Sequence, residues 1–203
     1  MTTAVEARPP GRPRSTEADR AILHATLELC ATEGFEGTTV EAVSARAGVG
    51  KATVYRRYPN RVGLVVAAAT EVCCGLADDA DTGSVREDLR LVAHGIVRTV
   101  RADLTRAMLV QIAAAAARLP ELREAQRQFV ATRRAVLIAA IRRGMERGEL
   151  RSDTDVRLMA DLIAAPLFHR AVMLGDEVDE RYGDAVVDAA ITAFQETRRG
   201  TPS

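Results

Sequence analysis

The chain has 203 residues, of which 47% are hydrophobic, so it is long and apolar enough to fold around a sizeable core. Its 28 basic and 28 acidic residues give a formal net charge of zero. No apolar run is long enough to span a bilayer, and the first residues lack the apolar core of a secretory signal, so we expect a cytoplasmic protein with no membrane partner. The three cysteines lack metal-ligand spacing; we interpret them as buried thiols, with redox sensing by Cys73 or Cys74 as the alternative.

The N-terminal segment, residues 1–14, is rich in proline and arginine and is expected to be a flexible, extended basic arm. A helix should follow it, with Thr16 as the N-cap and Gly34 as the end. We interpret residues 15–61 as one small helical unit and residues 62–203 as a second, larger one.

Two short helices joined by a tight glycine turn are predicted within the small unit. Thr38 and Glu41 have the spacing of a capping box, which opens the first of these helices. Gly48 should break it, and the second should run over residues 51–58 and stop before Pro59. This order of elements is typical of a helix-turn-helix, whose second helix enters the DNA major groove.

Positive charge is concentrated around the second short helix. No acidic residue occurs between Glu41 and Glu71, whereas five basic residues do: Arg46, Lys51 (the only lysine of the chain), Arg56, Arg57 and Arg61. A run of charge is often just a solvated face, and that is the alternative here. The coincidence with a glycine turn and a correctly phased apolar face favours a surface that meets a polyanion.

The outward face of this helix can be derived from its periodicity. If Val54 points inward, then Ala52 and Arg56 point away from the core, with Thr53 and Tyr55 on the two flanks. Arginine can pair bidentately with guanine, and the methyl groups of alanine and threonine can contact thymine. The basic residues at the helix ends are placed where phosphates would pass.

The stretch FEGTTVEAVSARAGVGKATVYRRYPNRVGL resembles the N-terminal DNA-binding domain of TetR-family transcriptional regulators. The positions that fit the family pattern are Thr39, Ala47, Gly48, Val49, Lys51, Val54, Tyr55, Arg57, Tyr58 and Arg61. Two of them depart mildly from it, because tyrosine at 58 replaces the commoner phenylalanine and arginine at 61 the commoner lysine.

The resemblance implies roles for individual residues. It assigns four residues to base edges: Ala52, Thr53, Tyr55 and Arg56. It assigns five to phosphates: Thr39, Lys51, Arg57, Tyr58 and Arg61, although core packing explains Tyr58 equally well. The GRPR stretch with Arg12 and Arg14 resembles the arms that enter the minor groove; a solubilising tail is the alternative.

The remaining chain keeps helical periodicity, so we expect an all-α fold of about nine helices and no strand. One helix is expected from Asn60 to about Ala77, and a long one from Pro120 to about Gly148. Two more should close the chain, one after Asp155 reaching about Leu174 and one spanning about residues 178–198. Pro166 should bend the first of these two.

Family members use the C-terminal helical domain to dimerise and usually to hold a small effector. The resemblance therefore implies a homodimer through the last two helices. Small residues recur there at helical spacing, with ordinary packing within the chain as the alternative explanation: Ala164, Ala165, Ala185, Ala189 and Ala193. Polar or soft residues on apolar helix faces are the effector candidates, and they suggest a mainly apolar molecule. They are His94, Met108, Gln111, Phe129, Arg133, Met159, Phe168, His169 and Met173.

An enzyme is disfavoured because the chain has no HExxH, Walker, GxGxxG or GxSxG motif, and no cofactor or metal is implied. The expected function is a repressor that an effector releases from a palindromic operator. Two alternatives remain: an activator, and a chromosomal DNA-binding protein without effector, which would have a filled core in its C-terminal helices.

Overall fold

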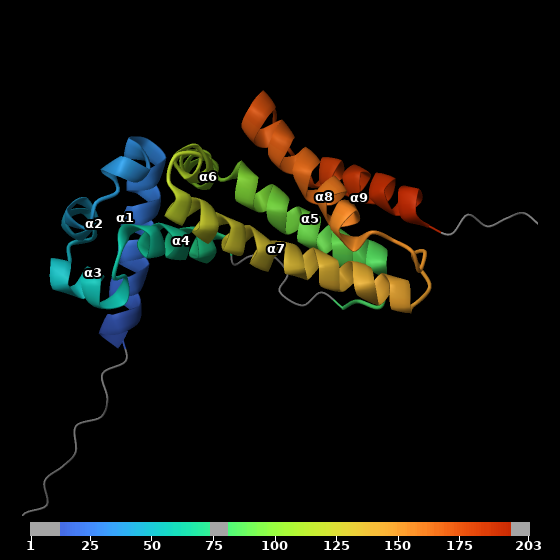
Figure 1. Ribbon diagram of the computed structural model, residues 1–203, viewed down its shortest axis with the longest axis horizontal. Helices are drawn as coiled ribbons and strands as arrows, with labels where there is room; N and C mark the ends of the chain where they lie inside the picture. The colour runs from blue at the N-terminus through green and yellow to red at the C-terminus, as the bar shows by residue number, and fades with distance from the viewer. Residues whose placement is uncertain (1–12, 74–80, 196–203) are drawn as a thin grey trace, which may run out of the picture.

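The computed structural model describes residues 13–73 and 81–195. Within these ranges every regular element is a helix, as expected for an all-α fold (Figure 1). The N-terminal elements are α1 (Pro13–Gly37), α2 (Val40–Ala47), α3 (Lys51–Arg57) and α4 (Arg61–Val72). The others are α5 (Val85–Arg101), α6 (Asp103–Ala116), α7 (Pro120–Glu146), α8 (Val156–Phe168), the π-helix η1 (His169–Leu174) and α9 (Glu180–Phe194).

Helices α1, α2 and α3 pack around a small core. Its fully buried side chains include Ile22 from α1, Val43 from α2, Val54 from α3 and Leu64 from α4. Because one apolar residue from each helix meets at this point, α3 is fixed with the opposite face toward solvent.

Glycines and one threonine set the turns of this unit. The backbone leaves helical geometry at Gly34 (φ 74°), where the end of the first helix was predicted, and Gly48 ends α2 in the left-handed region (φ 66°). Thr39 caps α2, because its hydroxyl accepts from the backbone N–H of Ala42 at 3.1 Å. The capping box predicted from Thr38 is wrong: that side chain is buried and donates to the carbonyl of Gly34.

Other helix ends also differ from the predictions. Helix α1 begins at Pro13 and not at Thr16, since proline suits a first helical turn. Helix α4 is capped by Asn60, which accepts from the N–H of Gly63 at 2.7 Å, and it ends at Val72; residues 74–77 of the predicted helix lie outside the described residues.

The bend expected at Pro166 takes the form of a change in helix type. Helix α8 ends at Phe168 and continues directly as the wider turns of η1. Proline has no N–H to donate to the carbonyl four residues earlier, so the regular ladder is interrupted there. The last helix, α9, begins after Asp179, whose carboxylate accepts from the N–H of Tyr182 at 2.8 Å.

A second core joins the N-terminal helices to the rest of the chain. It contains Cys30 and Phe35 from the α1 segment, Val65 from α4, and Met108 and Ile112 from α6. Figure 1 shows α6 lying against the upper end of α1, with α4 running from the N-terminal helices toward α7. The helix-turn-helix unit is therefore packed directly on the C-terminal helices.

The largest core lies between α5, α7, α8 and α9. A buried carboxylate holds one end of it: Asp88 on α5 is fully buried and accepts from both the N–H and the hydroxyl of Thr82 at 2.7 Å. Arg143 of α7 and Arg147, the C-cap of that helix, lie 3.7 and 3.5 Å from the same carboxylate. This cluster ties α5, α7 and the segment before α5 together.

Two of the three cysteines can be placed. Cys30 and Cys73 are buried, as expected, and burial raises the pKa of Cys30 to about 11. That thiol therefore stays protonated at neutral pH and is a poor nucleophile. Cys74 lies outside the described residues. In the described ranges, no helix is both long and apolar enough to cross a membrane.

Gly144→Ala is expected to destabilise the protein by about 1–3 kcal/mol, because the largest core has no room at this point. An added Cβ would lie 2.5 Å from Cγ2 of Val85. At Gly183 in α9 the added Cβ would lie 3.4 Å from Cγ2 of Val97, an ordinary contact. Gly183→Ala is therefore the matched control, and it should be neutral or stabilise by up to about 1 kcal/mol. Urea unfolding followed by circular dichroism measures both; equal effects would contradict the steric argument.

Candidate DNA-binding surface and effector cavity

Helix α3 presents the face that its periodicity predicted. Val54 is fully buried, whereas Ala52, Tyr55 and Arg56 are exposed and Thr53 is half-buried at the flank. The Tyr55 side chain is 49% exposed, which is unusual for an aromatic ring and leaves it available to a partner. The four residues assigned to base edges therefore share one accessible surface, at the outer edge of the molecule in Figure 1.

Two of the residues assigned to phosphates are cations at the ends of this surface. Lys51 donates to the Glu41 carboxylate at 3.0 Å, and this hydrogen bond lowers the pKa of Glu41. Arg61 makes an ion pair with Glu36 at 2.9 Å and donates to the carbonyl of the same residue. Its guanidinium also lies 4.2 Å from the ring centre of Phe35. Both cations are therefore held in place by the protein.

Two further cations, Arg57 at the end of α3 and Arg46 in the last turn of α2, are also paired. Arg57, with a side chain only 17% exposed, makes an ion pair with Asp19 of α1 and donates to the carbonyl of Thr53. Arg46 of α2 lies 3.5 Å from the carboxylate of Glu28, which is also on α1. These pairs could not be predicted from the sequence, because the acidic partners lie on α1, far from α3 along the chain.

Two other predicted DNA contacts, Thr39 and Tyr58, are only half-buried and are used by the fold itself. Thr39 uses its hydroxyl to cap α2, and Tyr58 packs against the small core. Burial, with Asp19 nearby, raises the pKa of Tyr58. Arg14 lies in the first turn of α1, and Arg12 lies outside the described residues.

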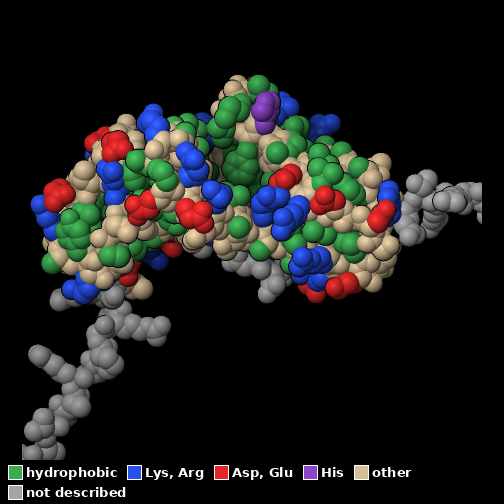
Figure 2. Space-filling model, viewed as in Figure 1, with side chains coloured by type: hydrophobic (Ala, Val, Ile, Leu, Met, Phe, Trp, Pro, Cys, Tyr) green, Lys and Arg blue, Asp and Glu red, His purple; other side chains and the backbone are tan. Residues whose placement is uncertain are grey.

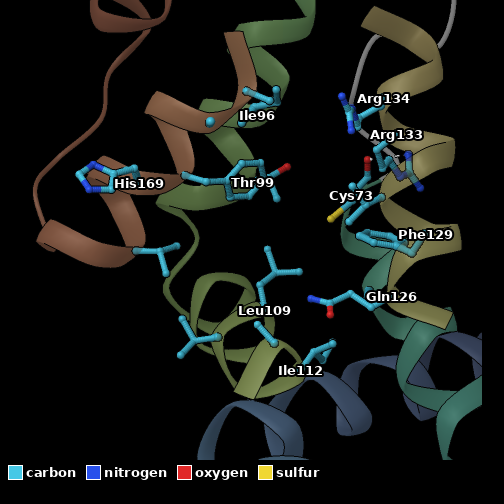
Figure 3. Close-up of a pocket in the computed structure, with 18 of the residues that line it drawn as sticks. Cys73, Ile96, Thr99, Leu109, Ile112, Gln126, Phe129, Arg133, Arg134 and His169 are labelled. Carbon is cyan, nitrogen blue, oxygen red and sulfur yellow. Dashed lines mark hydrogen bonds between the residues drawn. The ribbon is translucent and has the colours of Figure 1, made fainter. Parts of the chain in front are cut away.

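A cavity of about 790 Å³ lies between α4, α5, α6, α7 and the α8–η1 segment (Figure 3). Figure 2 shows a hollow with hydrophobic side chains in the middle of the molecule. Five of the nine effector candidates line the cavity: Phe129, Arg133, Phe168, His169 and Met173. The structure thus brings together residues from α7, α8 and η1 that the sequence could not relate to one another.

The other four candidates lie outside this cavity for identifiable reasons. Met108 and Met159 are fully buried and fill the second and the largest core. The His94 ring is bound to Asp184 of α9 at 2.8 Å. Gln111 faces the turn at Gly34, where its side-chain oxygen would lie 3.2 Å from an added Cβ.

Several lining residues were not among the candidates. They are mostly small or apolar: Val66, Ala69, Ile96, Thr99, Leu109 and Gln126. Of these residues, only Gln126 could have been suspected from the sequence, because its amide is next to the apolar positions of a predicted helix. Its side chain extends into the cavity (Figure 3) and makes no hydrogen bond with any described residue.

Arg133 connects the cavity wall to the end of α4. Its guanidinium donates to the carbonyls of Cys73 at 3.0 Å and Thr70 at 3.2 Å, and it lies 5.5 Å from the ring centre of Phe129. The carbonyls at a helix C-terminus attract a cation, so this contact stabilises the last turn of α4. Figure 3 shows Arg133, Cys73 and Phe129 together on one wall.

An apolar face on α8 and α9 is exposed among the described residues. Leu158 and Leu162 of α8 are 49% and 43% exposed, and Ala165 follows them one turn later. On α9, Ala185 and Ala189 are exposed. We call these residues the α8–α9 face. The described residues also hold no group of three or more histidine, cysteine or acidic side chains suited to a metal ion.

Comparison with known proteins gives the family of this fold and surface. Residues 22–68 match the family described as bacterial regulatory proteins, tetR family, and residues 79–190 match the family of tetracyclin repressor-like C-terminal domains. The HTH-type transcriptional regulator Rv1556 of Mycobacterium tuberculosis is 35% identical over 90% of this chain and 88% of its own length.

Two further proteins are similar over most of the chain. The DNA-binding transcriptional repressor TetR of Mycobacteroides abscessus is 29% identical, covering 86% of this chain and 92% of its own. The fold matches the crystal structure of FadR from Bacillus subtilis in complex with stearoyl-CoA, with a TM-score of 0.70, 18% identity and coverage of 87% of this chain and 99% of that one. With its helix-turn-helix and its helical C-terminal domain, the chain belongs to the TetR family of transcriptional regulators.

Proposed function

We propose that this regulator is a homodimeric repressor that binds a palindromic operator and is released from it by a small, mainly apolar effector. One observation carries this proposal: α4 begins with Arg61 beside the DNA-binding surface, and its C-cap, Cys73, lines the cavity. The proposal divides the chain into an arm (residues 1–14), a DNA-binding unit (15–61) and an effector-binding and dimerisation unit (62–203).

On DNA, α3 lies in the major groove. Arg56 reads a guanine edge, with Ala52, Thr53 and Tyr55 beside it, while Lys51 and Arg61 contact phosphates at the two ends of the helix. The exposure of these side chains supports this arrangement. In the same proposal Arg57 and Thr39 contact the backbone, and the arginines of the arm follow the minor groove.

The α8–α9 face forms the dimer interface. An exposed apolar surface on two adjacent helices is costly in water, and a second copy related by a two-fold axis covers it with the same residues. Two α3 helices then face the same side of the dimer. Half-sites about 34–36 Å apart, or a multiple of that, follow from one turn of B-DNA.

The effector occupies the cavity. Its volume of about 790 Å³ is in the range of small-molecule sites, and its lining is mainly apolar with Gln126, Thr99 and Arg133 as polar anchors. The binding of stearoyl-CoA by the structurally similar FadR supports a largely apolar ligand. An effector-less chromosomal protein would have a filled core here, so the cavity counts against that alternative.

Release follows from the position of α4. A ligand that fills the cavity presses on α4 from the side of Ala69 and Cys73, and it competes for the Arg133 guanidinium that holds the last turn of α4. A shift of α4 changes the distance between the two α3 helices of the dimer. A rigid operator penalises this change at both half-sites at once.

Arg56→Ala should reduce the preference for the operator over random DNA by about 1–3 kcal/mol, because it removes a base contact. Lys51→Ala should instead weaken binding to both duplexes equally and reduce the salt dependence of the affinity by about one unit of slope. An operator is first selected from a pool of random duplexes. Titration of each variant against this operator and, separately, against a random duplex measures both effects. Equal losses on the two duplexes for Arg56→Ala would contradict its assignment to base edges.

Leu162→Glu should convert the dimer to monomers, because it places a charge in the centre of the α8–α9 face. Sedimentation velocity measures the change, and operator binding should be lost with it. Leu104→Glu is the matched control: Leu104 is 40% exposed, close to the 43% of Leu162, but it lies on α6. A dimer that survives Leu162→Glu would place the interface elsewhere.

An effector should bind more weakly when operator is present, by the same factor by which it weakens operator binding. Couplings of about 1–3 kcal/mol give factors of about 5–150. Candidates from a thermal-shift screen of apolar acids, alcohols and acyl-CoA thioesters can be tested by calorimetry with and without operator. Ala113→Trp, at the cavity wall, should weaken ligand binding and leave DNA binding unchanged. Equal ligand affinities with and without operator would exclude an allosteric effector.

A further inference from the structure

The segment without acidic residues in the sequence is surrounded by acidic residues in the structure. It contains five cations, and four of these have a carboxylate partner: Arg46, Lys51, Arg57 and Arg61. The partners are supplied by the α1 segment and by the first turn of α2: Asp19, Glu28, Glu33, Glu36 and Glu41. Figure 2 shows acidic and basic side chains next to one another over the N-terminal helices.

Arg56 is the exception. It is exposed on the outer face of α3, and it makes no hydrogen bond or ion pair with any residue in the described ranges. Its neighbour Arg57 is paired with Asp19. The fold therefore neutralises the cations placed for the DNA backbone and leaves unpaired the arginine placed for base edges.

We propose that these carboxylates compete with DNA phosphates for Lys51, Arg57 and Arg61, and so hold down the affinity of this regulator for DNA of any sequence. The inference rests on the proposed DNA contacts above. When a cation that is already bound to a carboxylate moves to a phosphate, the binding free energy gained is only the difference between the two interactions. The released carboxylate then faces the polyanion and takes up a counterion, which reduces the net release of ions on binding.

The pair of Lys51 and Glu41 isolates this effect best. Both side chains are more than half exposed, at 57% and 56%, so a phosphate can reach the ammonium without a rearrangement of the helices. Arg61 is also held by the carbonyl of Glu36 and by the Phe35 ring, so the loss of its carboxylate partner would leave two other contacts. Exposed ion pairs have coupling energies that correspond to about a 1.4- to 5-fold change in an equilibrium constant.

Glu41→Gln is therefore expected to raise the affinity for a short mixed-sequence duplex by about twofold to fivefold and to steepen its salt dependence by up to about one unit of slope. Glu17→Gln is the matched control: it makes the same change of charge on the exposed surface of α1, and Glu17 has no ion-pair partner among the described residues. Fluorescence anisotropy at several salt concentrations gives both quantities. Melting temperatures check that each variant is folded.

A double-mutant cycle distinguishes competition for Lys51 from a general change in the electrostatic field of the protein. In a Lys51→Gln background, Glu41→Gln should change the affinity no more than Glu17→Gln does, because the cation that it competed for is gone. A gain that persists in this background, or an equal gain for Glu17→Gln, would overturn the inference and leave the DNA-binding function intact. A wild-type protein that fails to bind the duplex at low salt would overturn the proposed DNA contacts, and the inference with them.

Discussion

The core shared by α1, α4 and α6 is the constraint on which the rest of the structure depends. Cys30, Val65 and Met108 meet in it, so the helix-turn-helix unit packs through α1 directly against α4 and α6, two of the helices that line the cavity. Close-packed interiors do not deform gradually, and a change at the cavity must either be absorbed locally or move the helices as bodies. The 25-residue α1 segment, which contributes to both small cores, makes the second outcome possible.

Much of the fold could be predicted because its signals are local. The inward position of Val54 follows from helix periodicity alone, and the breaks at Gly34 and Gly48 follow from the need for a positive φ. It was harder to predict which of two adjacent residues caps a helix. Thr38 and Thr39 are both plausible caps, and the structure uses the second, because the first is turned into the core to bind the carbonyl of Gly34.

The site was less predictable, because periodicity shows that a face is buried but not what covers it. Met108 and Phe129 have the same pattern in the sequence, yet one fills a core and the other lines the cavity. Small lining residues such as Ala69 carry no signal at all. The carboxylates next to α3 were also invisible, since Asp19 reaches Arg57 only through the packing of α1.

The single lysine gives the DNA-binding surface an unusual chemical simplicity. Lys51 carries the only side-chain amine of the chain, and its side chain is 57% exposed. Acylation of side-chain amines is therefore confined to one atom, Nζ of Lys51, on the first residue of α3. Such a modification removes a positive charge and also strips Glu41 of its partner. One covalent event thus turns a neutral pair into a net negative charge at the point where the phosphate backbone would pass.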